Sequence, residues 1–328
     1  MDRRRFASLT LTSAAAILTR FPSAFAESGT IKFVVGTAPG GAIDPYARIV
    51  ADPMSKALGQ NIIVEYKPGA NGNASARYIG EQPADGSLVW VGTQAFTEIN
   101  PSAFKNQHWS IDDFVEIIRG VEAPLVFAAH PSVPANTFAE FLTWARANKG
   151  KLSYASYQPG TPSHFLGYQL NEKFGLDLTH VPYRGSGLQA TALVGGQSLF
   201  GFAQVNSTMP MAEAGKLKLL AITNPIRYRF LPNVPTFAEL GYPEFTAKVW
   251  FGLFVNKATP EAIVKSYVEA AKTAHSDPNV KKKLEAQGFE VVAETGPQLL
   301  PNIKEQIARW AKLVEASGFS AEDRGSTK

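Results

Sequence analysis

Cysteine is absent from this chain of 328 residues. Its absence excludes disulfide bonds, thiolate nucleophiles, thiolate metal sites and iron–sulfur clusters, so the fold must depend on its hydrophobic core. Several other patterns are missing: the Gly-Lys-Ser/Thr ending of a P-loop, H-E-x-x-H and G-x-S-x-G. The first glycine-rich turn lacks G-x-G-x-x-G, and the five histidines show no metal-ligand spacing. We therefore expect no nucleotide, no metal and no other cofactor.

A large excess of one charge is missing as well. The formal net charge is +4, but the first 26 residues hold four arginines and one aspartate. Without them, 28 Lys and Arg residues face 27 Asp and Glu residues. This balance argues against nucleic acid as a partner. No apolar segment reaches the roughly 20 residues that a membrane-spanning helix needs.

The N-terminal segment has the pattern of an export signal. Arg3–Arg5 form a basic region, residues 7–18 form an apolar region, and Ala24-Phe25-Ala26 fits the small-residue cleavage site. We predict a signal peptide over residues 1–26 that is cleaved after Ala26. Because Arg3–Phe6 also fits the twin-arginine pattern, two export routes stay open, as does retention as an uncleaved anchor.

The first strand, turn and helix after this signal predict a site for an anion. Residues 31–35 form an apolar strand, 36–41 a turn of small residues, and 43–58 carry helical spacing with Asp44 placed to cap the start of the helix. A helix N-terminus offers unpaired N–H groups and the positive end of the helix dipole, which together favour phosphate or carboxylate. The alternative is a tight turn that binds nothing.

Similar strand–turn–helix units recur along the chain. Residues 62–66 and 88–91 predict further strands in the first half, and 151–154, 179–183, 199–203 and 217–223 in the second. Between the halves, residues 115–121 and 125–129 predict two separate strands. Strands that alternate with helices favour parallel, doubly wound sheets with ligands at the carboxyl ends of the strands. We therefore expect two α/β lobes of similar plan.

Other candidate residues leave more than one interpretation open. Ser156, His164 and Asp44 have the chemistry of a hydrolytic triad, although such residues more often cap helices and hydrogen-bond within loops. Arg184 has the geometry to bind a carboxylate through two nitrogens or to hold its own loop. Several aromatic residues near turns could either line a pocket or pack in the core: Phe96, Tyr157, Phe165, Trp250 and Phe251.

Taken in order, the motifs of the chain resemble those of the periplasmic solute-binding proteins of tripartite tricarboxylate transporters, the Bug or TctC family. The matching segments are Ala38-Pro39-Gly40-Gly41 with Asp44 and Arg48, Pro68-Gly69-Ala70 with Gly72-Asn73, Asp85-Gly86, Tyr154-Ala155-Ser156 with Gly160-Thr161 and His164, His180 to Gly185, Gly195-Gly196-Gln197, Ala214 to Leu217, Leu231 to Thr236, and Trp250 with Gly252-Leu253. They cover almost the whole mature chain.

The resemblance implies a two-lobed periplasmic-binding-protein fold of type II-like plan, with the ligand in a cleft between the lobes. Residues 27–127 and 252–328 would form lobe 1 and residues 128–251 lobe 2, with hinges near 128 and 250. It implies a periplasmic protein without enzymatic activity, which captures a small organic carboxylate and delivers it to a membrane transporter. A periplasmic Ser/His hydrolase, or a protein that presents its ligand to a sensor kinase, is the alternative.

The resemblance also places the ligand on loops from both lobes. The expected ligand-binding residues are Pro39, Gly40, Gly41, Ala42, Asp44, Thr93, Gln94, Ser156, Tyr157, Gln158, Gly160, Thr161 and His164, with Arg184, Gln204 and Trp250 as further candidates. Glycine is common in the family where Gln158 stands, so a larger or aromatic acid is one expectation.

Overall fold

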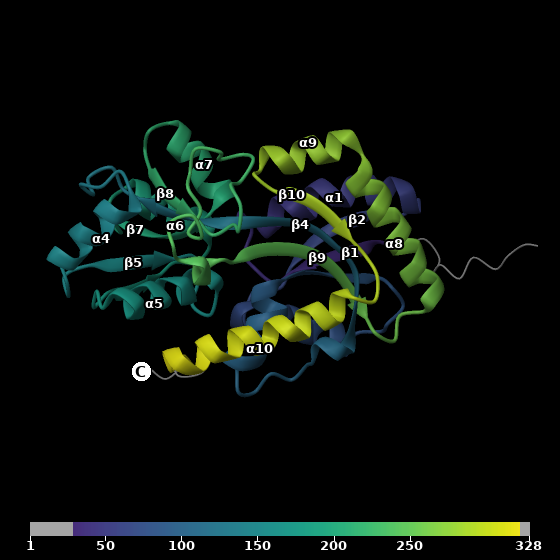
Figure 1. Cartoon of the computed structure of the whole chain (residues 1–328). Helices are drawn as coiled ribbons and strands as arrows, with labels where there is room; N and C mark the ends of the chain where they lie inside the picture. Colours follow the sequence, from purple (N-terminus) through teal and green to yellow (C-terminus); the bar gives the residue numbers. More distant parts are fainter. Residues whose placement is uncertain (1–28, 322–328) are drawn as a thin grey trace, which may run out of the picture.

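The computed structural model of the protein describes residues 29–321, in which ten strands form one sheet that runs through both halves of the molecule (Figure 1). The strand order is β2-β1-β3-β9-β4-β7-β5-β6, and β8 and β10 pair with β4 beside this path. The predicted signal peptide, residues 1–26, lies outside the described residues. Within 29–321 no helix has both the length and the apolar character needed to cross a bilayer.

The strands and helices alternate as the sequence predicts for an α/β fold. The strands are β1 (Ile31–Val35), β2 (Ile62–Tyr66), β3 (Leu88–Thr93), β4 (Phe114–Ala129), β5 (Ser153–Ser156), β6 (Thr179–Pro182), β7 (Phe200–Gln204), β8 (Lys218–Ile222), β9 (Lys248–Asn256) and β10 (Glu290–Glu294). The helices are α1 (Ile43–Leu58), α2 (Asn73–Glu81), α3 (Asn100–Ala103), α4 (Phe138–Ala147), α5 (Pro162–Phe174), α6 (Ser186–Val194), α7 (Val205–Glu213), α8 (Glu261–Ser276), α9 (Pro278–Ala286) and α10 (Leu299–Ser317). A π-helix, Ala95–Ile99, precedes α3.

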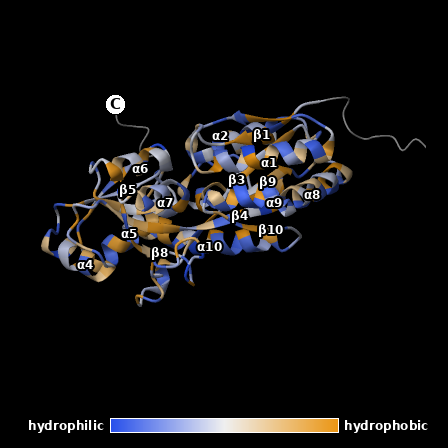
Figure 2. Cartoon of the chain, turned by 90° about the horizontal axis from the view of Figure 1, so that it is seen from above, coloured by the Kyte–Doolittle hydropathy of each residue, from blue (hydrophilic) through white to orange (hydrophobic). Residues whose placement is uncertain are grey.

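Each lobe is built on three parallel strands. In lobe 1, β1 pairs in parallel with β2 and β3, and in lobe 2, β5 pairs in parallel with β6 and β7. The inner strands β1, β3, β5 and β7 are mostly buried because helices cover the sheet, whereas β2 and β6 at its two ends are largely half-buried or exposed. Helix α1, for example, turns Tyr46, Val50 and Met54 inward. Figure 2 shows the two groups of elements from above, with hydrophilic and hydrophobic residues mixed along helices such as α1 and α8.

Strand β4 joins the two lobes. Its first part, up to Pro124, pairs with β9, and its last part, from Leu125, pairs with β7 and β8. The prediction of two separate strands here is wrong, because Pro124 lacks only an N–H and the strand continues through it. The chain leaves lobe 1 along β4 and returns along β9, so these two pair antiparallel, as do β8 and β10 with β4. The sheet is therefore parallel within each group of three strands and antiparallel where the lobes join.

The pairing also indicates where one lobe gives way to the other. The partners of β4 change between Pro124 and Leu125, shortly before the predicted limit at residue 127. The β9 residues from Lys248 onward pair with lobe 1 strands, shortly before the predicted limit at 252. The lobe limits and the hinges near 128 and 250 stay predictions.

Helix α10 crosses from lobe 1 to lobe 2 along one side of the molecule (Figure 1). It packs against the π-helix and α3 in lobe 1 and against α5 in lobe 2. The Tyr168 hydroxyl of α5 donates to the Ala316 carbonyl at 2.6 Å, and the Ala321 N–H donates to the Ala103 carbonyl of α3 at 3.0 Å. The last described turn of the chain therefore contacts both lobes.

Candidate functional site

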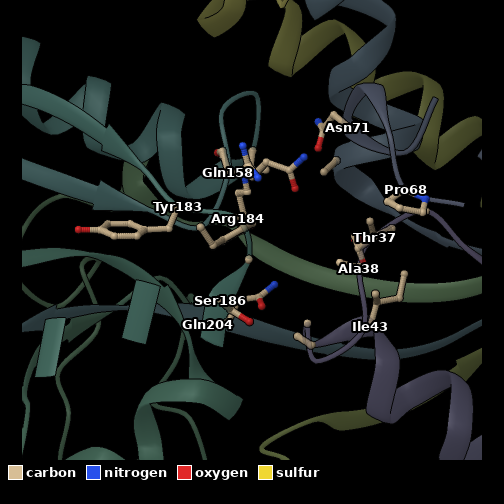
Figure 3. Close-up of a pocket in the computed structure, with 18 of the residues that line it drawn as sticks. Thr37, Ala38, Ile43, Pro68, Asn71, Gln158, Tyr183, Arg184, Ser186 and Gln204 are labelled. Carbon is tan, nitrogen blue, oxygen red and sulfur yellow. The ribbon is translucent and has the colours of Figure 1, made fainter. Parts of the chain in front are cut away.

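A cavity of about 940 Å³ lies between the lobes. It is lined by the loops that follow β1, β2 and β3 in lobe 1 and β5, β6 and β7 in lobe 2, so it meets the carboxyl ends of all six parallel strands. Figure 3 shows Thr37, Ala38 and Pro68 on one wall and Gln158 and Arg184 on the other. This is the place where α/β sheets bind ligands.

Hydrogen bonds to the Asp44 carboxylate stabilise the turn between β1 and α1. The Gly40 N–H donates to Asp44 Oδ2 at 3.0 Å, the Arg48 Nε donates to Oδ1 at 2.8 Å, and the Tyr66 hydroxyl also donates to Oδ1. Burial opposes ionisation of Asp44, but these three donors outweigh it and lower its pKa. Gly40 has a φ of +85°, which only glycine adopts without strain. Asp44 therefore supports the turn and does not line the cavity. The prediction that it caps α1 is wrong, because the N-cap is Ala42 and Asp44 lies inside the helix.

Several helices begin at the cavity wall without a side-chain cap. Helix α1 starts beside Gly41, Ala42 and Ile43, all of which line the cavity, and Ala42 at its N-cap has no capping side chain. In lobe 2, the N-cap positions of α5, α6 and α7 make no side-chain cap hydrogen bond either; they are Thr161, Gly185 and Gln204. Uncapped N-termini leave N–H donors and positive dipole ends for a ligand. Their convergence from both lobes favours an anion.

The charge of the residues that line the cavity also favours an anionic ligand. Among the described residues that line the cavity, Arg184 is the only charged one, so no lining carboxylate repels an anion. Its side chain is exposed, and it makes no ion pair with any residue in 29–321. Much of the remaining wall is apolar, including Phe96, Tyr157, Val249 and Phe251. The cavity thus combines positive potential with apolar surface.

The structure brings most of the predicted ligand-binding residues to the cavity. Those that line it are Pro39, Gly40, Gly41, Ala42, Thr93, Tyr157, Gln158, Thr161, Arg184 and Gln204. Those that do not are Asp44, Gln94, Ser156, Gly160, His164 and Trp250. Of the aromatic candidates, Phe96 and Phe251 also line it, while Phe165 is fully buried in the core.

The predicted residues that do not line the cavity have partners elsewhere in the structure. Successive side chains of a strand point to opposite faces, so Val249 and Phe251 line the cavity while Trp250 points away from it. The Trp250 Nε1 donates to Glu98 at 2.9 Å, and the Arg119 guanidinium lies 4.3 Å from the centre of its ring. The Gln94 amide donates to the Lys248 carbonyl, which ties the end of β3 to β9.

The structure pairs Ser156 with a histidine other than the predicted His164. The Ser156 Oγ lies 2.7 Å from Nε2 of His180, and Ser156 is fully buried. His164 stands in the first turn of α5, which starts at Pro162, and its Nδ1 accepts the Gly160 N–H at 3.3 Å. Asp44 belongs to the opposite lobe and is bound by Gly40, Arg48 and Tyr66. The three residues therefore do not form a triad.

Two loops at the cavity were largely missed from the sequence. Pro68 to Asn71 follow β2, and the segment from Pro182 to Leu188, of which only Arg184 was a candidate, follows β6. Both carry the signal that identified the first turn, which is a short strand, small residues and then a helix start. A Cβ atom at Gly187 would lie 3.7 Å from the Gly40 carbonyl, so the two lobes nearly touch at one rim of the cavity.

Comparisons with known proteins agree with the fold. Residues 46–319 match the model of the TctC family, described as the tripartite tricarboxylate transporter family receptor. BugT of Bordetella pertussis is 28% identical, with 88% of this chain and 89% of that protein covered. The structure of MatC from Rhodopseudomonas palustris with bound malate has a TM-score of 0.81 and 30% sequence identity, and the match covers 88% of this chain and 99% of MatC. The structure of R. palustris Rpa4515 with adipate has a TM-score of 0.83 and 27% identity, and the match covers 90% of this chain and 99% of Rpa4515.

The chain is a two-lobed solute-binding protein of the periplasmic-binding-protein fold, and it belongs to the TctC family of transporter receptors. The family consists of periplasmic solute-binding proteins and not of enzymes, so the hydrolase alternative is wrong. This agrees with the position of Asp44 in the lobe opposite Ser156 and His164, where Gly40, Arg48 and Tyr66 bind it.

Proposed function

We propose that this protein captures a small organic carboxylate between its lobes and delivers it to the membrane subunits of a tripartite tricarboxylate-type transporter. The observation that carries the proposal is the cavity with four uncapped helix starts and no acidic residue in its described lining. The related proteins with bound malate and adipate support a carboxylate as the ligand. The sensor kinase stays an alternative partner that these observations do not favour.

In this proposal a carboxylate of the ligand accepts hydrogen bonds from the N–H groups at the start of α1, beside Gly41 and Ala42. The loop from Tyr157 to Thr161 covers it from lobe 2, and Tyr157 with Phe251 contacts its carbon chain. Because Gln158 and the aromatic walls occupy the same cavity, an acid with a longer or aromatic body is favoured. The N-terminal signal, cleaved after Ala26, would bring the protein to the periplasm.

Isothermal titration against a panel of organic acids tests this function. The panel contains mono- and dicarboxylates of increasing length, aromatic acids, and the matching neutral amides. Binding of at least one acid with a dissociation constant in the micromolar range or below, and no binding of its amide, is the expected result. If every acid fails to bind, or if the amides bind as well as the acids, the carboxylate function is rejected.

Arg184 provides a prediction about acids with two carboxylates. As the only charged residue of the described lining, it is placed to pair with a second carboxylate at the lobe 2 side. Arg184→Gln is expected to weaken dicarboxylate binding by roughly 10- to 100-fold, because hydrogen bonds to charged groups contribute about 1.5–3 kcal/mol. Monocarboxylate binding should change little. Arg77→Gln, at an exposed arginine of α2, is the matched control.

A further inference from the structure

Asn71 connects the two lobes across the cavity. It lies in the turn after β2, in lobe 1, and is 9% exposed. Its Nδ2 donates to the Gly160 carbonyl at 3.1 Å, in the ligand-side loop of lobe 2, and to Oδ1 of Asn100 at 2.8 Å. Away from the joining strands and α10, this is a direct polar bond between a lobe 1 turn and the loop that covers the cavity. Figure 3 shows Asn71 on the lobe 1 wall and Gln158 of that loop on the opposite wall.

A chain of side chains fixes the orientation of this amide. The Trp109 indole can only donate, and it donates to Asn73 Oδ1 at 3.0 Å. Asn100 must therefore present its Nδ2 to Asn73, at 2.9 Å, and its oxygen to Asn71. Asn71 must then direct its nitrogen toward Asn100 and Gly160. The donor that reaches across the cleft is thus set by contacts buried within lobe 1.

The backbone on both sides is shaped for this contact. Asn71 has φ 50° and ψ 44°, a left-handed conformation that asparagine tolerates better than most residues. Gly160 has a φ of +69°, and a Cβ atom there would lie 3.5 Å from the Asn71 Nδ2 and 3.2 Å from Phe319. Gly160 is therefore enclosed between Asn71 of lobe 1 and the C-terminal segment that follows α10.

The loop that contains Gly160 also forms the lobe 2 wall of the cavity. Gln158, Pro159 and Thr161 line it, and the Gly160 N–H is held by His164 within the same lobe. A bond to the Gly160 carbonyl therefore positions this wall against lobe 1. The Oδ1 of Asn71 is buried and has no hydrogen-bond partner among the described residues, so closure leaves one acceptor unsatisfied. This limits how strongly the bond holds the lobes together.

We infer that Asn71 is a positioning residue that holds the Gln158–Thr161 loop against lobe 1 in the closed protein, and so slows the release of the ligand. Asn71 does not need to contact the ligand for this role. When the lobes separate, the Gly160 carbonyl and the Asn71 amide both gain water, which allows the bond to break and reform during each cycle of binding.

The absence of cysteine makes this inference directly measurable. Ala57→Cys on α1 and Ala147→Cys on α4 place one exposed spin label on each lobe, and the distance between the labels reports on closure. Without ligand, Asn71→Gly is expected to shift the distance distribution to longer values. This variant preserves the left-handed backbone. Asn71→Asp, which keeps the shape but loses the donor, should give the same shift at neutral pH.

Asn61→Gly is the matched control, because Asn61 is exposed in the same lobe and the shift should be absent. Identical distributions for the unsubstituted protein and both Asn71 variants would overturn the inference. This measurement needs no ligand, so its failure is separate from failure of the carboxylate function.

With malate or adipate as probe, Asn71→Gly should raise the dissociation rate about 3- to 10-fold and leave the association rate nearly unchanged, as expected for one hydrogen bond. An unchanged dissociation rate of a probe that binds would also overturn it.

Discussion

Gly41→Asp is expected to abolish the binding of organic acids. Gly41 lines the cavity beside the first turn of α1, and a Cβ atom there would find only ordinary contacts, 3.7 Å from Thr37 Oγ1 and 3.9 Å from the Ala38 carbonyl. A new carboxylate would therefore fit the turn and occupy the position proposed for the ligand. Two like charges at 4 Å repel by about 4 kcal/mol at an effective dielectric constant of 20, which corresponds to roughly 1,000-fold in affinity.

The matched variant is Gly41→Asn, which has nearly the same shape and no charge. It should lose much less affinity than Gly41→Asp, and the difference between the two should shrink as salt is added. Titration calorimetry measures both affinities, and thermal melting without ligand should show that both variants remain folded. Equal losses for aspartate and asparagine would mean that shape, and not charge, governs this turn.

The second large effect concerns the stability of the protein as a function of pH. Glu98 is fully buried in the π-helix, where it accepts hydrogen bonds from Trp250 of β9 and Trp310 of α10. Burial raises its pKa to about 7 from an ordinary value of 4.5, although the two indoles and Arg119 oppose the shift. Burial also raises the pKa of Glu116 in β4 to about 7, against the attraction of Arg119. Both carboxyls lie close to the strands that join the lobes.

The sign of the effect follows from the raised values. Between pH 4.5 and pH 7 the folded protein retains protons on these carboxyls that the unfolded chain has lost, so stability falls as the pH rises through this range. At about 1.4 kcal/mol per pKa unit, Glu98 alone lowers the free energy of unfolding by about 3 kcal/mol between these limits. Below pH 4.5 the penalty from Glu98 is absent, and above pH 7 it is fully present.

Urea unfolding at a series of pH values measures this dependence. The side chain of Glu98→Gln cannot ionise. In this variant the free energy of unfolding should therefore fall less between pH 4.5 and 7, by the amount that ionisation of Glu98 contributes. The overall stability of this variant will differ, because a glutamine nitrogen cannot accept from an indole, and so the slope is the quantity to compare. A slope equal to that of the unsubstituted protein would contradict the assignment.

The parts of the site that were predictable from the sequence are those made by one continuous segment. An apolar strand, small residues and a helical repeat indicate the turn from Gly36 to Gly41, and all three are local signals. The same signals precede α6, where the sequence predicts a strand over 179–183, but within Pro182 to Leu188 they single out only Arg184 as a ligand candidate. Helix and strand types followed from periodicity, whereas the length of β4 required knowledge of its partners.

The parts that were not predictable depend on how separate segments pair. Ser156 contacts His180 because β5 and β6 lie side by side in parallel, with Tyr154 opposite His180. Trp250 faces away from the cavity because the register of β9 directs its neighbours inward. Asn71 was missed because its role depends on Asn100, Trp109 and Gly160, which lie 29 to 89 residues away along the chain. Such contacts leave no pattern within a single segment.

The continuous strand β4 has a consequence for how the molecule unfolds. Because its two ends pair with strands of different lobes, loss of either lobe would expose the backbone of the other along β4 and β9. Helix α10 adds a second such link. We therefore expect a single heat-absorption peak in scanning calorimetry, with equal calorimetric and van't Hoff enthalpies, where two lobes on flexible linkers would melt in two steps. The two lobes, between which the ligand is proposed to bind, would then unfold as one cooperative unit.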